Sequence, residues 1–484
     1  MEGTGIVRIL IRIATAFGLF ALIARRLFGP RIASIIGLTW KAAFRFRLFW
    51  VITVLLVGSV ILLPIVIKDD GTARGFTQIL LTYTLSVVTA LLGLCTLWLS
   101  CGTLARDIEE NQMQVVAVKP VARWQIWIGK WLGLVTLNAV LLAIAGVFIF
   151  ALLQWRAQKL PPNQQRILRE EVLVARGSLK EPVRDVDSEV ERIFRERMKD
   201  TPVNEARAAA VKQQLREALK VDVVQPNYMR RWTFDLGLRK NFLRDEPLFA
   251  RLKFHAASTN ELGTYRLRIE VGEPNTPDRR SMDQTFADNA FHEVRIPANM
   301  WNPSGILTID VQNRDRAALI FPLEDGFELL YRESNFPVNF ARGLLIILFW
   351  LALLAAIGLA AASFLSFPVA AFVSASLMFV ALSSGTLSSA VESGTITGVN
   401  EETGESGRSV LDFVLIPTFK GMLQVFRLVE GFSPIDALST GRAVGWDIVV
   451  LAFAQIVLLL GGIVATFGIW MFTRRELAAT STHS

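Results

Sequence analysis

The chain has 484 residues, of which 52% are hydrophobic and 19% are charged, and its formal net charge is +8. This composition excludes an ordinary soluble globular protein and predicts segments long enough to span a bilayer. The basic excess does not indicate nucleic-acid binding, because many of the basic residues flank apolar stretches, as the positive-inside rule predicts for membrane proteins. We therefore expect the lipid bilayer as a partner and no nucleic acid.

The first 48 residues are expected to lie at the membrane interface. Arg8 and Arg12 interrupt the first apolar run, which favours an interfacial helix over a seventh membrane span. Further on, aromatic and aliphatic residues recur on one helical face while basic residues stack on a neighbouring stripe. We interpret this segment as an interfacial elbow, with the start of a tilted span as the alternative; its residues are Trp40, Lys41, Phe44 and Arg45.

Six later stretches are long enough to cross about 30 Å of hydrocarbon. They are residues 49–67, 76–100, 131–154, 343–362, 369–387 and 448–472. The basic residues of the short loops place both termini and the 101–130 loop in the cytoplasm. The 156–342 segment then lies outside the cytoplasm, as does the long loop before the last span.

The outside segment changes its periodicity near residue 228. Before that point apolar residues recur at helical spacing, whereas later stretches alternate between apolar and polar residues, as in Tyr265 to Val271. We expect a helical region followed by an antiparallel β-sandwich. The predicted parts are interfacial helices (1–48), three spans (49–155), the helical region (156–227), the β-sandwich (228–338), two spans (339–390), an outside loop that re-enters the membrane or lies on it (391–447), and the last span with its tail (448–484).

Three aromatic residues of the β region have two interpretations. Trp232, Tyr265 and Trp301 could line a ligand surface on which sugars stack, or they could fill the core of the sandwich. Burial in the core is the interpretation that their residue types favour.

The sequence offers no catalytic or cofactor site. No glycine-rich phosphate-binding motif occurs, and neither His255 nor His292 has metal-ligand spacing. The predicted spans hold essentially no ionisable side chains, whereas ion-coupled carriers usually need such groups at mid-membrane. We expect no enzyme activity, no metal and no cofactor in this chain, and any energy for transport to come from another subunit.

The 101–130 loop carries the motifs that indicate function most clearly. An acidic patch is followed by the turn Lys119-Pro120-Val121-Ala122-Arg123 and by the entry Gly129-Lys130-Trp131-Leu132-Gly133. Together with the tail Phe472-Thr473-Arg474-Arg475-Glu476, this pattern resembles ABC-2 type permeases, the membrane subunits of ATP-binding cassette transporters. The resemblance covers both membrane halves but not the outside domain, which is inserted between the third and fourth spans.

The resemblance implies a coupling helix that docks into a groove of a separate ATPase subunit. The residues assigned to this coupling loop are Arg106, Asp107, Glu109, Glu110, Lys119, Pro120, Arg123, Gly129 and Lys130. It further implies a homodimer, or a heterodimer with a related permease, in a bacterial inner membrane, with the 156–342 domain in the periplasm and a role in export or the cell envelope. The alternatives are a loop that only sets topology, and a membrane-anchored binding or scaffold protein without transport activity.

Overall fold

A computed structural model describes two compact units, Val174–Asn335 and the remainder of the chain, Met1–Leu173 with Phe336–Ser484. The described residues are 29–66, 72–110, 121–168, 172–181, 185–197, 211–212, 214–216, 218–244, 246–258, 262–274, 276–323, 325–382, 412–430 and 432–475. We call the first the sheet unit and the second the helical unit, and we describe each by itself.

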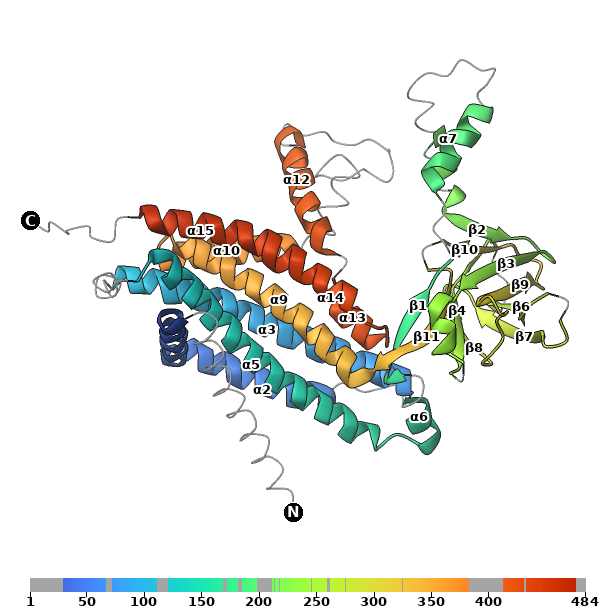
Figure 1. Cartoon of the computed structure of the whole chain (residues 1–484), viewed down its shortest axis with the longest axis horizontal. Coiled ribbons are helices and arrows are strands. Elements are labelled where there is room, and N and C mark those ends of the chain that lie inside the picture. The colour runs from blue at the N-terminus through green and yellow to red at the C-terminus, as the bar shows by residue number, and fades with distance from the viewer. Residues whose placement is uncertain are drawn as a thin grey trace, which may run out of the picture. The chain divides into compact units, whose positions relative to one another are not determined.

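The helical unit is built from long apolar helices (Figure 1). After the Gly29–Arg45 helix, its elements are α2 (Arg47–Val66), α3 (Ala73–Glu109), α5 (Arg123–Ala157), α6 (Pro162–Ile167), α9 (Phe336–Ala362), α10 (Phe367–Leu382), α12 (Asp412–Glu430), α13 (Pro434–Ser439), α14 (Trp446–Ala452), the π-helical η3 (Phe453–Gly461) and α15 (Gly462–Arg474). The last three form one continuous helical stretch.

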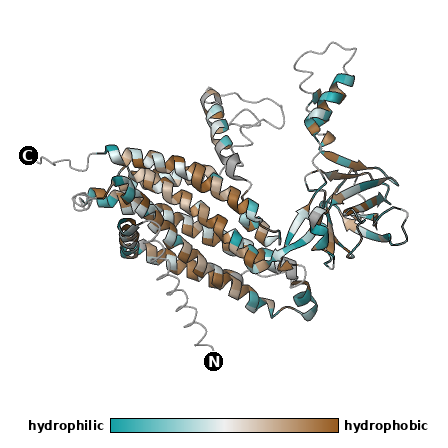
Figure 2. Cartoon of the chain, in the orientation of Figure 1, coloured by the Kyte–Doolittle hydropathy of each residue, from teal (hydrophilic) through white to brown (hydrophobic). Residues whose placement is uncertain are grey.

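Four helices of this unit are long and apolar enough to cross a membrane. They are Thr77–Glu109, Arg123–Ala157, Phe336–Ala362 and Trp446–Arg474, with 33, 35, 27 and 29 residues. Each overlaps one of the predicted spans, and the chain is a membrane protein by this criterion. Figure 2 shows the hydrophobic colouring of these helices, in contrast to the mixed colouring of the sheet unit.

Two of the six predicted spans, 49–67 and 369–387, are not among these four helices. The Gly29–Arg45 helix and the following helix are bent by 78° and together count as one further span at most. The predicted span 369–387 is described only up to residue 382, over which it forms α10, an apolar helix of 16 residues; residues 383–387 lie outside the described part of the chain. Within the described residues there are thus four candidate spans, or five with the bent pair.

Small residues allow the bundle helices to approach closely. A Cβ atom on Gly358 of α9 would lie 1.8 Å from Ser100 Oγ of α3, and one on Gly468 of α15 would lie 3.0 Å from the Cα of Ala360. Two further small residues of α9, Ala352 and Ala356, are buried as well. Such small-residue contacts stabilise helix pairs in a membrane, where burial of apolar surface gives little driving force.

The sheet unit contains three sheets with the strand orders β1-β11-β4-β8, β2-β10-β5 and β3-β9-β6-β7, and every strand pairing in them is antiparallel. Its elements are β1 (Val174–Leu179), α7 (Val186–Arg197), β2 (Val221–Val224), β3 (Met229–Asp235), η2 (Gly237–Asn241), β4 (Leu248–Leu252), β5 (His255–Ala256), β6 (Thr264–Val271), β7 (Arg280–Ala287), β8 (His292–Ile296), β9 (Ile306–Asn313), β10 (Leu319–Pro322) and β11 (Phe327–Asn335).

One hydrophobic core joins the sheets. Alternate residues of β9, namely Leu307, Ile309 and Val311, are fully buried, as expected for a strand with one inward face. Trp232 of β3 stacks on Phe327 of β11 with ring centroids 4.6 Å apart, which connects the two four-stranded sheets across the core. The arrangement fits the predicted β-sandwich.

The predicted boundary between a helical region and the sandwich at residue 228 is wrong. Strands β1 and β2 lie inside the range 156–227, and they pair with β11 and β10. Gly177 of β1 is packed so closely on Tyr331 that a Cβ atom would lie 2.4 Å from the ring. The strand is therefore held by a partner about 150 residues away in the sequence, which no local periodicity reveals. Helix α7 does lie within the predicted helical region.

The loop before the last candidate span folds onto α9. The side-chain Nδ2 of Asn339 in α9 donates to Arg442 O at 2.8 Å, and its Oδ1 accepts from the backbone N–H of Val444 at 2.6 Å. Helix α12, which contains Pro417, also lies in this loop. The prediction that the segment re-enters the membrane stays a prediction, and residues 383–411 lie outside the described part of the chain.

Candidate functional site

The residues predicted for the coupling loop lie mainly at the ends of two long helices. Arg106, Asp107 and Glu109 belong to the last turns of α3, which continues to Glu109 instead of ending near residue 100. The extension is stabilised by burial, since Leu104 is fully buried. Arg123, Gly129 and Lys130 belong to the first turns of α5, whereas Lys119 and Pro120 lie outside the described residues. The prediction of a separate loop over 101–130 is therefore wrong for its two ends.

An ion pair between a buried lysine and a half-buried aspartate joins α3 to α5. Lys130 is 6% exposed, and its ammonium lies 2.6 Å from Asp107 Oδ2 and 2.7 Å from Thr103 O. A buried charge is tolerated only when it is paired and hydrogen-bonded. Asp107 and Thr103 supply both interactions, so this lysine fixes the end of α3 against the beginning of α5.

Two arginines bind the carboxyl ends of other helices. Arg123 Nη1 donates to Thr473 O at 2.7 Å and to Arg475 O at 2.9 Å, where α15 ends. Arg475 Nη1 in turn donates to Ser363 O at 3.3 Å, just after the last residue of α9. The last carbonyls of a helix lack partners within the helix and carry partial negative charge, so a guanidinium is a favourable ligand there.

A carboxylate performs the converse role for α10. Glu109 Oε1 accepts a hydrogen bond from the backbone N–H of Phe367, the first residue of α10, at 3.0 Å. Helix amino termini favour such anions. Beside it, the Arg106 guanidinium lies 4.9 Å from the ring centre of Phe46 and 4.8 Å from that of Phe367. These cation–π contacts place Arg106 between α10 and the elbow.

These side chains together connect the ends of five helices, α3, α5, α9, α10 and α15. We refer to them as the helix-end cluster, consisting of Arg106, Asp107, Glu109, Arg123, Lys130 and Arg475. Sequence reasoning found five of the six as site residues and noticed Arg475 only as part of the tail motif. It could not find their partners, because most of these are backbone groups of distant residues. Glu110 lies beside the cluster with its side chain exposed, and its backbone N–H donates to Arg106 O at 2.8 Å.

The predicted elbow residues lie where the Gly29–Arg45 helix meets α2. Trp40 Nε1 donates to Thr136 Oγ1 of α5 at 3.0 Å, and Phe44 packs edge-on against Phe49 at 5.2 Å. Lys41 and Arg45 are exposed. Trp40 thus fixes the elbow to α5, and Phe44 connects it to α2.

The glycines of the Gly-Lys-Trp-Leu-Gly motif have a packing role. A Cβ atom on Gly129 would lie 2.8 Å from Ile35, and one on Gly133 would lie 2.7 Å from Thr39. Both positions must therefore remain without a side chain for the Gly29–Arg45 helix to lie against α5. This explains why the motif carries small residues four apart.

The proposed aromatic ligand surface of the sheet unit is wrong for two of its three residues. Trp232 is 3% exposed and Tyr265 is fully buried, and both belong to the core. The Tyr265 hydroxyl donates to Ser258 O at 2.8 Å, which satisfies its polar atom inside the sandwich. Trp301 is partly buried and packs against the same core. The structure supports the alternative interpretation, in which these residues fill the core of the sandwich.

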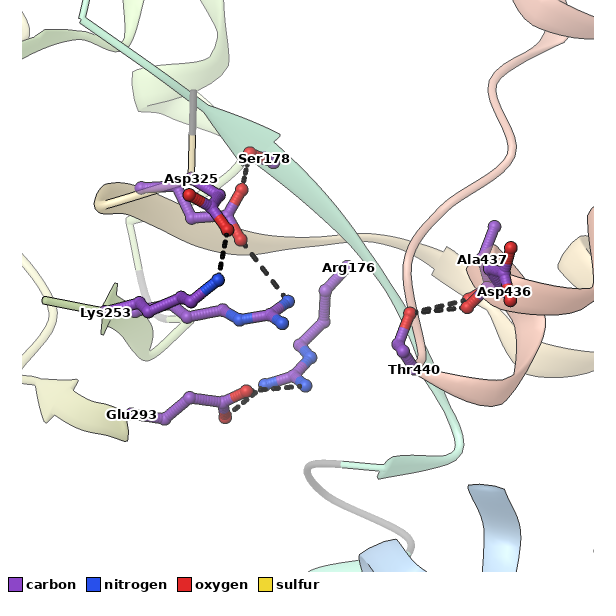
Figure 3. Close-up of polar contacts among 10 residues, drawn as sticks. Arg176, Ser178, Lys253, Glu293, Asp325, Asp436, Ala437 and Thr440 are labelled. Carbon is purple, nitrogen blue, oxygen red and sulfur yellow. Dashed lines mark hydrogen bonds and ion pairs between the residues drawn. The ribbon is translucent and has the colours of Figure 1, made fainter. Parts of the chain in front are cut away.

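Buried ion pairs form a second polar cluster, within the sheet unit (Figure 3). Arg176 of β1 makes two hydrogen bonds to Glu293 of β8, at 2.7 and 3.1 Å. Glu328 of β11 is fully buried, accepts from Ser178 at 2.6 Å and lies 3.3 Å from Arg251. These pairs connect the four strands of one sheet, so we assign them a structural role. Sequence reasoning missed them because their partners lie up to 150 residues apart.

Two further polar groups are accounted for by local structure. In the helical unit, Thr440 Oγ1 donates to Asp436 O at 2.6 Å at the end of α13 (Figure 3). In the sheet unit, His292 Nε2 lies 2.9 Å from Ala287 O. Among the described residues, no group of three or more His, Cys, Asp or Glu side chains could hold a metal ion.

Comparison with known proteins gives no match: no family model, no curated protein and no solved structure is similar to this chain at a significant level. The interpretation of the helix-end cluster therefore rests on its contacts and on the sequence motifs that it contains.

Proposed function

We propose that this chain is the membrane-spanning permease subunit of an ATP-binding cassette transporter of the ABC-2 type, powered by a separate ATPase subunit. In this proposal the α3/α5 end of the helical unit faces the cytoplasm of a bacterial inner membrane, and the sheet unit lies in the periplasm. Two copies, or this chain and a related one, form the pathway for export or for a cell-envelope function.

The observation that carries the proposal is the helix-end cluster. The chain between α3 and α5 comprises only residues 110–122. Side chains on its two sides bind the ends of α10 and α15, and Arg475, which follows α15, binds the end of α9. A partner that moves this connection would therefore act on five helix ends together. Transport powered by an external ATPase requires such mechanical coupling, since the chain itself has no phosphate-binding motif.

The contacts also sharpen the assignment of docking residues. Asp107, Glu109 and Arg123 already bind groups within the chain, so their substitution would disturb the bundle as well as any partner. Exposed positions at the same end are better candidates for direct contact with an ATPase. Among the described residues these include Glu110, which is exposed, and Trp124, which is 47% exposed.

Site-specific photo-crosslinking tests the proposal. A photoreactive phenylalanine analogue at Trp124 should capture, in native membranes, a protein that carries a phosphate-binding loop. The matched control is the same analogue at Phe242 of the sheet unit, which is 85% exposed and should not capture the ATPase. If Trp124 captures no ATPase while Phe242 captures an envelope component, the chain is a membrane-anchored scaffold and the permease proposal is wrong.

A further inference from the structure

The Gly29–Arg45 helix, the dark blue helix in Figure 1, presents a basic face that the proposed permease function does not use. Arg31, Ser34, Leu38, Lys41 and Arg45 recur at helical spacing, and all five are exposed. The opposite face packs on α5, and its residues Ile32, Ile36, Thr39 and Ala43 are all buried. The exposed residues thus form a continuous line of about 21 Å on the outward side. We call Arg31, Lys41 and Arg45 the basic stripe.

No acidic side chain neutralises the basic stripe from the elements that carry it or pack against it. The residues from 29 to 66 contain no Asp or Glu, and neither does α5 from Arg123 to Ala157. At the end of α3, Asp107 binds Lys130 and Glu109 binds the first amide of α10, and among the described residues no ion pair joins Glu110 to a residue of the stripe. Within the described part of the chain, the three cations of the stripe therefore face outward without an anionic partner.

Apolar side chains flank the stripe. Leu38 is 59% exposed, Phe44 is 43% exposed and Trp50 at the start of α2 is 54% exposed. The Trp50 indole donates to Phe44 O at 3.1 Å, which orients its ring at the bend. A soluble protein partner would not require this combination, whereas a helix at a membrane surface inserts its apolar residues and directs its basic ones toward the headgroups. The helix is bent by 78° from the apolar helix that follows it, and its close contacts at Gly129 and Gly133 place it against the candidate span Arg123–Ala157.

We propose that the basic stripe binds the phosphate headgroups of anionic phospholipids in the adjoining leaflet, so that this helix is a lipid-selective contact of the protein. Basic residues near an anionic membrane surface each raise binding roughly five-fold, and the effect falls within a Debye length. The inference depends on the membrane location of the helical unit and not on the identity of its energy source.

The test uses the full chain in nanodiscs with spin-labelled phosphatidylglycerol or phosphatidylcholine. The fraction of motionally restricted lipid should show a several-fold preference for phosphatidylglycerol at low salt. The triple variant Arg31→Gln/Lys41→Gln/Arg45→Gln should lose most of this preference. A matched control, Arg266→Gln/Arg280→Gln/Arg295→Gln, removes three exposed positive charges from the sheet unit and should keep it.

Three results would overturn the proposal. The first is equal restriction of both lipids by the unmodified chain, and the second is an unchanged preference in the triple variant. The third is complete competition by the soluble glycerophosphoglycerol headgroup, which would identify a site for a free phosphate compound. If the second result is accompanied by loss of an ATPase partner, the stripe is a protein-docking surface. None of these readouts depends on transport, so they can fail or succeed separately from the proposed function.

Discussion

Charged side chains serve different purposes in the two units of this protein. In the helical unit, Arg123, Arg475 and Glu109 bind the unpaired backbone groups of helix ends. In the sheet unit, charged side chains bind one another across strands, as Arg231 does with Asp310. The difference follows from backbone hydrogen bonding. A helix leaves carbonyls and amides unsatisfied at its ends, whereas paired strands satisfy theirs along the ladder and leave side chains to pair on the faces.

The comparison separates what stabilises each unit. The sheet unit depends on its apolar core, and its exposed ion pairs contribute little. In the helical unit the long helices pack through apolar and small residues, and polar contacts at their ends connect α3, α5, α9, α10 and α15. The predictions below test this distinction, beginning with the largest expected effect.

The largest loss of stability is expected for a substitution in the core of the sheet unit. Trp232→Ala removes a side chain that is 3% exposed and stacks on Phe327, so we expect a loss of about 4 kcal/mol in the stability of this unit. Hydrogen exchange of β3 and β11 in the full chain measures it. Phe242→Ala is the control, because Phe242 is 85% exposed and its truncation should change exchange little. Similar exchange in the two variants would refute the central role of the core.

The second-largest loss of stability is expected at the pair of Asp107 and Lys130 in the helix-end cluster. Asp107→Ala leaves the Lys130 ammonium buried with only Thr103 O as a partner, which should cost about 3 kcal/mol in thermal unfolding in detergent. Because Asp107 is 30% exposed, water moderates the effect. The double variant Asp107→Leu/Lys130→Met should recover much of the loss, since it removes both charges. A single variant as stable as the unmodified chain would show that the pair does not hold the two helices.

Adjacent arginines in the tail offer a charge-matched test. Arg475→Gln removes hydrogen bonds to the end of α9 and should destabilise the helical unit by about 2 kcal/mol. Arg474→Gln removes the same charge but only an exposed contact with Trp470, and should cost less than about 1 kcal/mol. Thermal unfolding in detergent distinguishes the two. Equal losses would mean that net charge at the tail matters and helix-end binding does not.

The smallest effect is expected for an exposed ion pair of the sheet unit. The hydrogen bond from Arg268 lowers the pKa of Asp283 below its usual value. A lowered folded-state pKa contributes stability that is present above the unfolded pKa and is lost as the pH falls through the folded pKa. Arg268→Gln should therefore move the acid-induced loosening of β6 and β7 to a slightly higher pH. Hydrogen exchange between about pH 5 and pH 2 checks this, and an unchanged profile would argue that the pair contributes nothing.

Local patterns predicted those parts of the fold that local physics determines. Hydropathy located the four candidate spans, and alternation located strands such as β6 and β9. Strand β1 was missed because its formation depends on pairing with β11, far along the chain. The end of α3 was placed too early because its last turns carry charged residues, which are stabilised there by contacts with other helices.

The candidate site was predictable in its residues but not in its geometry. The motifs pointed to Arg123, Lys130 and Glu109, yet the partners of Arg123 are backbone carbonyls about 350 residues away. Any residue has a carbonyl, so sequence alone contains no signal for such a contact. The aromatic residues of the sheet unit show the same limit, since residue type favoured the core but only packing could assign Trp232 to it.

The most direct test of the account is the composition of the native complex. The tagged chain would be purified from native membranes in mild detergent, after cross-linking, and its partners quantified by mass spectrometry. The account predicts a stoichiometric ATPase subunit with a phosphate-binding loop, and a weaker association in Glu110→Lys, whose side chain is exposed beside the helix-end cluster. A preparation that contains no ATPase even after cross-linking would contradict the permease proposal and would direct attention to the sheet unit as the functional part of the chain.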